Sequence, residues 1–164
     1  MTDYPVMFTV RDTVSGDGFL AGVTLTGRAI ITREDNKWWV YGVRPAPIAE
    51  SGDTPQEAFL RFRNSYKNVL FDFAGCSAKF ENFREAVEQF YHQPDQEEEK
   101  RWVAAFAAIR SGAVKPEPPF FSELPKEDPD TRPTQITVER LDKENTRYTS
   151  TDNVSDYCAM AKAA

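Results

Sequence analysis

The segment that decides the fold is Glu50-Ser51-Gly52-Asp53-Thr54-Pro55-Gln56-Glu57-Ala58-Phe59. Thr54 is a favourable N-cap, Pro55 suits the first helical position, and Glu57 stands where a capping box places its acidic residue. Strand-like segments precede this helix start. The order of elements therefore predicts β-hairpins followed by a helix.

The first forty residues read as strands. Residues 5–13 alternate apolar and polar side chains, which predicts one strand. Residues 19–33 predict either one long strand with a bulge at Gly27 or two short strands. Residues 35–36, Asp-Asn, are typical of a two-residue hairpin turn because both tolerate left-handed backbone geometry, and residues 37–43 return as a strand. We expect three to four antiparallel strands in a meander.

Three helices are predicted after this meander. The first carries one apolar stripe with helical spacing, and Gly75 is expected to stop it. The stripe consists of Phe59, Phe62, Tyr66, Val69, Leu70 and Phe73. A second helix is predicted over about 78–92. Asp95 and Glu98 have the spacing of another capping box, and the third helix that they begin is expected to end near Gly112. Its inward side chains are Trp102, Val103, Phe106 and Ile109.

The fold class is α+β, with the sheet packed by the first amphipathic helix and accompanied by two further helices. Residues 1–112 form this domain and its helical extension. Six of the eleven prolines fall within residues 113–133, interleaved with acidic residues, which predicts an extended linker. Residues 134–164 are a C-terminal tail. Within the tail, residues 135–141 alternate weakly and favour a short strand, whereas the polar residues 142–156 are expected to be mobile.

Composition narrows the classes of function. The formal net charge is −6, and an acidic surface repels phosphate, so we expect no direct binding to nucleic acid. No apolar run is long enough to span a membrane, and the N-terminus lacks the pattern of a signal peptide. The two cysteines, Cys76 and Cys158, are too few for a disulfide framework. A cytoplasmic protein is the expectation.

Few residues could carry chemistry. The single histidine, His92, lies at the predicted end of the second helix, where it complements the helix dipole. Asp17, Asp35 and Asp53 could hold Mg²⁺ for phosphoryl chemistry, although each also suits a turn or a cap. Cys76 has no evident base partner. We therefore predict no catalytic, cofactor-binding or metal-binding residue, and a protein that is not an enzyme.

Two groups of surface residues are candidates for protein binding. Trp38 and Trp39 are adjacent, so on a strand they point to opposite faces, and one of them together with Tyr41 could form an interaction hot spot. The alternative is that the later helices cover that second face. A basic group on the first helix is the other candidate, and it could receive an acidic partner. Its members are Arg61, Arg63 and Lys67.

The order of elements over residues 4–75 resembles the HicB-like antitoxin domain. The resemblance is carried by the Tyr-Pro-Val strand at residues 4–6, the Gly-Asp-Gly turn at residues 16–18 and the Ser-Gly-Asp-Thr-Pro-Gln-Glu-Ala segment at residues 51–58. It implies a partial ribonuclease-H-like α/β unit that sequesters a small messenger-RNA-cleaving toxin. The chain departs from the family by an extra hairpin over about 28–43 and by the absence of a C-terminal helix-turn-helix or ribbon-helix-helix pattern.

Three hypotheses for function follow. The first is a non-catalytic protein-binding module that resembles a HicB-like antitoxin and sequesters a small protein partner. The second is a structural or accessory protein of a mobile element or a bacterial cell that assembles with itself into a homo-oligomer. The third is a metal-dependent hydrolase or nuclease that uses the three aspartates at residues 17, 35 and 53.

Overall fold

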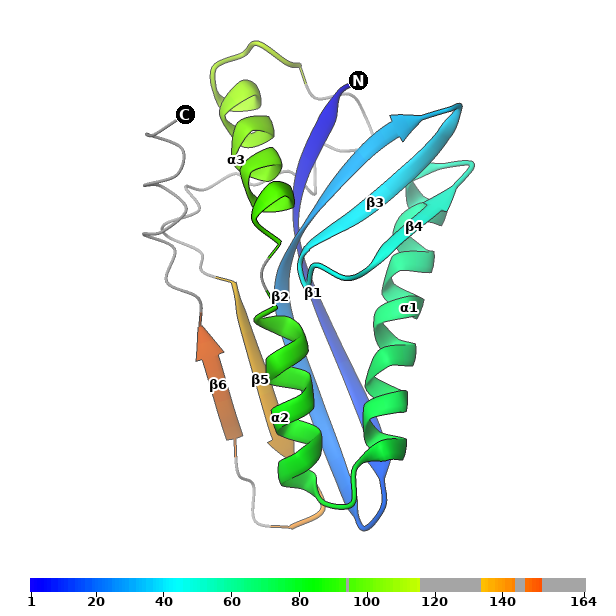
Figure 1. The fold of residues 1–164 in the computed structure, drawn as a ribbon, viewed down its shortest axis with the longest axis vertical. Coiled ribbons are helices and arrows are strands. Elements are labelled where there is room, and N and C mark those ends of the chain that lie inside the picture. Colours follow the sequence, from blue (N-terminus) through cyan, green and yellow to red (C-terminus); the bar gives the residue numbers. More distant parts are fainter. Residues whose placement is uncertain (94, 116–133, 144–146, 152–164) are drawn as a thin grey trace.

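The computed structural model describes residues 1–93, 95–115, 134–143 and 147–151 (Figure 1). Its central element is a long hairpin of β1 (Asp3–Gly16) and β2 (Phe19–Glu34), which pair along their whole length. Gly18, in the connecting turn, has a φ of 72°, a conformation that glycine adopts without a steric penalty. β2 is a single strand, as in the first of the two predicted alternatives. The predicted irregularity lies one residue after Gly27, where the pairing of β2 with β3 shifts register between Arg28 and Ala29.

The second edge of β2 is shared by two strands. β3 (Lys37–Arg44) pairs with residues 28–34 of β2, and β5 (Gln135–Arg140) pairs with residues 21–26. The turn between β2 and β3 is the predicted one, with positive φ at Asp35 and Asn36. Figure 1 shows β3 beside the upper half of β2 and β5 beside its lower half. The upper and lower halves of β2 therefore have different neighbouring strands.

Two short strands complete an antiparallel sheet of six strands. β4 (Ala49–Gly52) pairs with β3, and β6 (Arg147–Thr151) pairs with β5. The predicted number of three to four strands is therefore wrong. β4 is too short to show a periodic pattern, and β6 lies in the polar stretch that was expected to be mobile. Residues 144–146 and 152–156 of that stretch, and residues 116–133, lie outside the described residues.

The helices are α1 (Pro55–Cys76), α2 (Phe80–Tyr91) and α3 (Gln96–Arg110). The predicted cap of α1 is confirmed, because the Thr54 hydroxyl accepts a hydrogen bond from the Glu57 amide at 3.1 Å. The Glu57 carboxylate accepts from the Asp53 amide, one residue before the cap. Asp95 caps α3 by accepting from the amides of two residues in its first turn.

The end of α1 differs from the prediction. Gly75 lies inside the helix, which continues to Cys76 and has Ser77 as its C-cap. The Ser77 hydroxyl donates to the carbonyl of Phe73 at 2.6 Å. The Ser77 hydroxyl thus satisfies one of the carbonyls at the end of the helix. In a glycine cap, backbone amides that follow the helix would bond such carbonyls instead.

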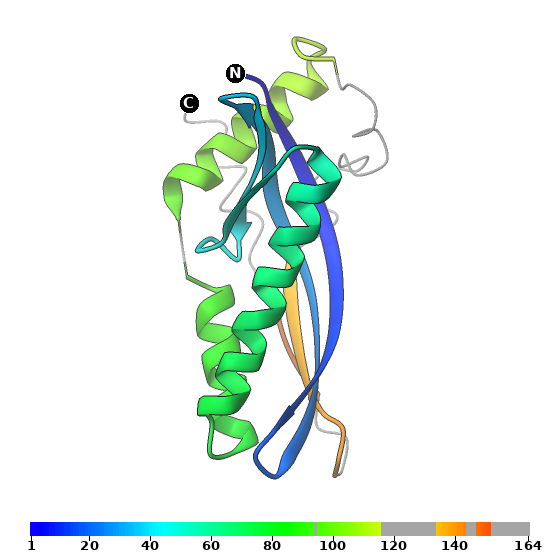
Figure 2. The same cartoon turned by 90° about the vertical axis from the view of Figure 1, so that its right-hand side faces the viewer.

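The core lies between one face of the sheet, here called face A, and the helices α1 and α2. Aromatic side chains dominate it: Phe8 meets Phe62 edge to face at 5.4 Å, and Phe19 meets Phe83 at 5.4 Å. Figure 2 shows α1 and α2 on the same side of the lower part of the β1–β2 hairpin. Such aromatic pairs add about 0.5–1.5 kcal/mol beyond their burial.

Among the described residues, the opposite face, face B, is covered only in its upper half. There α3 places Trp102 against Ile30 of β2 and Val43 of β3, with Met7 of β1 at the margin. The indole Nε1 of Trp102 donates to the carbonyl of Val6 at 3.3 Å. No described helix covers the lower half of face B. Within the described residues, no helix combines the length and the apolar character needed to cross a membrane.

Candidate binding surface on the uncovered half of face B

The uncovered half of face B, called the open face below, is a grid of side chains from four strands. The pairing registers place them in three rows that cross β1, β2, β5 and β6 in turn. The rows are Thr9, Thr26, Gln135 and Thr151; Arg11, Thr24, Thr137 and Thr149; and Thr13, Gly22, Glu139 and Arg147. Seven of the twelve residues are threonine, so most side chains of the surface are β-branched and carry a hydroxyl group.

Cross-strand polar contacts hold this grid in place. Thr9 and Thr26 share a hydrogen bond between hydroxyls at 3.2 Å, and Thr137 and Thr149 share another at 2.9 Å. The Arg11 Nε donates to the Thr24 hydroxyl at 3.3 Å. Pairs of this kind each contribute about 0.2–1 kcal/mol to a sheet. The threonine side chains are therefore ordered before any ligand arrives.

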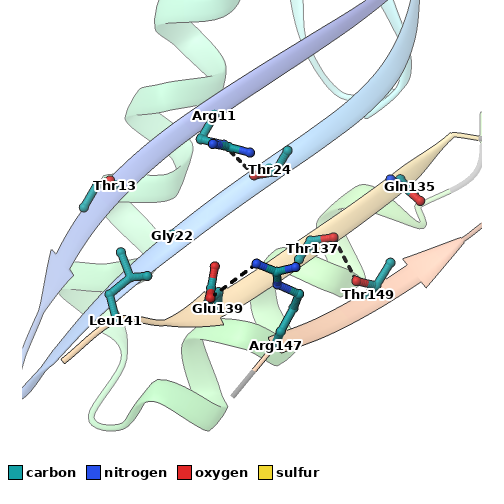
Figure 3. A pocket seen from close by; sticks show the side chains of 10 residues that line it. All are labelled: Arg11, Thr13, Gly22, Thr24, Gln135, Thr137, Glu139, Leu141, Arg147 and Thr149. Atoms are coloured by element: carbon teal, nitrogen blue, oxygen red, sulfur yellow. Dashed lines mark hydrogen bonds and ion pairs between the residues drawn. The ribbon is translucent and has the colours of Figure 1, made fainter. Parts of the chain in front are cut away.

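The open face is hollowed by about 460 Å³. Figure 3 shows that the hollow is lined by the middle and lower rows and by Gln135 of the first row, with Leu141 at one end next to Gly22. A Cβ atom on Gly22 would lie 3.3 Å from the Leu141 side chain, so the glycine lets that side chain lie close to the sheet. The volume is within the usual range of ligand sites, but those sites are mostly apolar, and this one is lined by hydroxyls and charged groups.

Three charged side chains lie on the open face. Arg11 is on β1 at one side of the grid, Arg147 is on β6 at the other, and Glu139 on β5 lies between them. Nη2 of Arg147 is 3.6 Å from a Glu139 carboxylate oxygen. Figure 3 shows both guanidinium groups lying over the strand next to their own. The open face thus has two positive charges and one negative charge.

The open face carries groups suited to binding. The lining residues include neither a histidine nor a cysteine, and the one lining carboxylate, Glu139, lies 3.6 Å from Arg147. Among the described residues, no three side chains of the metal-ligating types gather into one group. Hydroxyls, an amide and two guanidinium groups can instead donate and accept several hydrogen bonds at once.

The boundary between the covered and open halves is a buried ionic contact. Arg44 at the end of β3 donates to Glu99 of α3 at 2.6 Å, and both side chains are less than a tenth exposed. Arg28, the register partner of Arg44 on β2, is fully buried, and its guanidinium lies 4.5 Å from the centre of the Trp102 ring. These contacts fix α3 over the upper half of face B.

The predicted aromatic candidates are divided between the two faces, as the alternation requires. Trp38 is half-buried against the core on face A, with Tyr4 at 6.5 Å. Trp39 stacks on Tyr41 on face B at 5.7 Å, beside the first turns of α3. Arg101 of α3 lies 5.2 Å from the Tyr41 ring, so α3 covers part of the second face.

A network of ionic contacts surrounds this stacked pair. Tyr41 donates its hydroxyl to Glu34 at 3.1 Å, and burial, followed by this hydrogen bond, raises the pKa of Tyr41. Arg101 holds Asp3 through two hydrogen bonds of 2.7 and 2.8 Å, and this contact is the main cause of the raised pKa of Arg101. The pair is thus built into the packing of α3 and lies away from the open face.

The three basic candidates of α1 have different surroundings. Arg61 donates to the carbonyl of Ser51 at 2.9 Å and to Glu57 at 2.6 Å, so it ties the helix to β4. Arg63 and Lys67 are exposed on the outer side of α1, and Lys67 lies 5.8 Å from the ring of Phe71. The structure does not bring these side chains together with Trp39 and Tyr41.

The residues considered for chemistry are also dispersed. His92 is the C-cap of α2, and its Nε2 is 2.6 Å from the Ser150 hydroxyl of β6. Cys76 is exposed and has no disulfide, and Cys158 lies outside the described residues. Asp35 occupies the hairpin turn, and Asp53 is 3.8 Å from Lys37. Together with Asp17 in the first turn, these aspartates form no common site.

Sequence reasoning did not select the residues of the open face. The available signal was the alternation in three segments, where polar residues occupy every second position at 9–13, 22–26 and 135–139. Their convergence depends on the pairing of β2 with β5, which are more than a hundred residues apart.

A comparison of the chain with protein-family models, with curated proteins and with solved structures finds no match.

Proposed function

We propose that the chain is a non-catalytic protein-binding module that holds a small protein partner on the open face. The observation that carries this proposal is the uncovered half of face B. It is four strands wide, ordered by its own cross-strand hydrogen bonds and hollowed in the middle. A sheet face whose side chains are already ordered loses little conformational entropy when it binds a partner.

Two further points support a binding role. The open face presents donors and acceptors but no pair of groups arranged for proton transfer and nucleophilic attack. The resemblance of residues 51–58 to the HicB-like antitoxin segment also favours a module that sequesters a partner, and in that case the partner would be a small toxin. The segment at residues 51–58 leads into α1 on face A, whereas the proposed contact surface is on face B.

Site-specific photo-crosslinking in the native host tests this proposal. A photoreactive amino acid would replace Thr137 at the centre of the open face or, as a matched control, Gln89 on the exposed side of α2. We expect the Thr137 position to yield one protein adduct of defined mass that the Gln89 position does not yield. Identical adducts from both positions, or no adduct from Thr137, would refute binding at this surface.

Self-assembly is a second candidate because of the free edge of β1. Among the described residues, this strand of 14 residues pairs with β2 alone, and an unpaired edge of that length is a template for another strand. Light scattering over a hundredfold range of concentration tests it. A stable homo-oligomer that Thr13→Lys on β1 dissociates would favour assembly, whereas a monomer throughout would exclude it.

A further inference from the structure

We propose that the open face recognises an extended acidic segment of its protein partner, and that Arg11 and Arg147 each pair with one of two carboxylates placed two residues apart. The inference deepens the proposed function and rests on it. It specifies the chemistry of the bound segment and the spacing of its charges.

The charge of the open face is opposite to that of the chain. The whole chain has a net charge of −6, whereas the three charged groups of the open face sum to +1. Arg11 is exposed, and its hydrogen bond to a threonine hydroxyl uses only Nε. The Arg147 side chain is 67% exposed and its contact with Glu139 is long. Both guanidinium groups therefore keep donors available for a carboxylate of a bound partner, and a carboxylate is the group that a guanidinium pairs with best.

The separation of the two arginines favours an extended segment. Their strands are three places apart in this part of the sheet, which is about 14 Å, and their rows differ by two residues, which is about 7 Å. Each side chain lies over the neighbouring strand (Figure 3), so the charged groups are nearer to each other than their backbones are. In an extended chain, side chains at positions i and i+2 lie on the same side about 7 Å apart, and they can reach both groups.

The hydroxyl groups between the arginines suit a polypeptide. Thr24 and Thr137 lie side by side in the middle row, and a hydroxyl can both donate to a carbonyl and accept from an amide. A single-stranded nucleic acid would be bound differently, by a continuous basic groove with aromatic side chains that stack on bases. The lining of the open face contains no aromatic residue. The observations therefore favour an acidic polypeptide over a polynucleotide.

Fluorescence anisotropy with defined peptides and the full chain tests the inference. The probe is a labelled peptide of about nine glycine, serine and threonine residues with two glutamates at positions i and i+2. One control peptide has the same composition with the glutamates adjacent, where they point to opposite sides of an extended chain. Another control replaces both glutamates by glutamine. A labelled oligothymidylate of similar length is the nucleic-acid probe, and low salt preserves exposed charge pairs.

We expect the i, i+2 peptide to bind about three-fold more tightly than the adjacent one, and the glutamine peptide to bind more weakly than both. Arg11→Gln and Arg147→Gln should each weaken binding about three-fold, the scale of one exposed ion pair. Lys79→Gln, which removes one positive charge at the start of α2, should leave binding unchanged. Glu139→Gln should strengthen it about three-fold, because it removes the carboxylate that competes for Arg147.

Three results would overturn the inference. They are equal affinity for the glutamate and glutamine peptides, weakening by Lys79→Gln equal to that by the arginine variants, and tighter binding of the oligothymidylate than of the acidic peptide. None of them affects the crosslinking outcome at Thr137. A defined adduct there together with failure of the peptides would leave the binding surface in place and exclude the acidic segment. Absence of any adduct would exclude the surface itself.

Discussion

Replacing Glu99 by glutamine should destabilise the protein by about 3 kcal/mol. Glu99 and Arg44 are 2.6 Å apart, and their side chains are 8% and 9% exposed. The substitution keeps the size of the side chain but removes the Glu99 carboxylate from the buried Arg44 charge, which lies beside the fully buried Arg28. Removing one partner of a buried ion pair costs about 3–5 kcal/mol, and the lower end applies because both residues make other contacts.

Urea denaturation followed by circular dichroism measures the loss, and hydrogen exchange of residues 96–110 locates it. We expect faster exchange in α3 than in α1, since this ion pair is one of the contacts that attach α3 to face B, together with Trp102 and the Arg101–Asp3 pair. Glu97→Gln is the matched control on the same helix. Glu97 pairs with Lys100 at 3.2 Å but is 86% exposed, so its loss should cost under about 1 kcal/mol.

The double variant Arg44→Met/Glu99→Leu separates the ion pair from packing. If the penalty of Glu99→Gln comes from an uncompensated charge, apolar residues of similar size should recover most of the stability. The reasoning is refuted if Glu99→Gln costs less than about 1 kcal/mol, or if the double variant is no more stable than the single one.

Four further substitutions have definite expected outcomes. Tyr66→Phe should be neutral or stabilise by up to about 1 kcal/mol in thermal unfolding, since the buried Tyr66 hydroxyl has no hydrogen-bond partner among the described residues. Tyr91→Phe should instead destabilise by about 1 kcal/mol, because it removes the hydrogen bond that the Tyr91 hydroxyl donates to the Thr26 carbonyl. Arg140→Gln should raise the pKa of Asp142, which its hydrogen bond to Arg140 lowers to about 2. In the native chain the stability from that lowered pKa is present above about pH 4 and is lost as the pH falls toward 2, and a carboxyl NMR titration of both proteins follows the change. Gly27→Ala should cost about 1–3 kcal/mol in urea denaturation, because its Cβ would lie 2.2 Å from a main-chain oxygen of β3.

Local signals in the sequence were sufficient for the elements that depend on neighbours along the chain. The cap at Thr54 and the turn at Asp35-Asn36 involve residues within four positions of each other, and both occur as predicted. The stop at Gly75 failed for a physical reason. Ser77 supplies a hydroxyl to the end of α1, so a glycine in left-handed geometry is not required there.

The open face could not be predicted because it depends on long-range pairing. Thr24 and Thr137 are adjacent only because β5 returns to the lower edge of β2. The weak alternation over residues 135–141 predicted the strand but gave no information about its neighbour. The predicted number of strands was too low for the same reason, because β6 forms only by pairing with β5 and local alternation does not reveal that pairing. The candidates chosen from sequence were large aromatic and basic side chains, and the structure uses Trp38 and Arg61 mainly for packing and for the attachment of α1.

The change in polarity along face B links the fold to the proposed function. On β1 the side chains of this face change from Met7 to Thr9, and on β2 they change from Ile30, next to α3, to Thr24 below it. Both strands change at the level where β3 gives way to β5 as the neighbour of β2. The apolar half is long enough for α3, and the polar half continues the same sheet without a described helix. Apolar side chains in the lower half would have required another element to cover them. Threonines that form hydrogen bonds with each other tolerate contact with water and remain ordered. Among the described residues, half of one face of the sheet is therefore polar, uncovered and linked by cross-strand hydrogen bonds, which are conditions under which a polar segment of another protein can bind at low entropic cost.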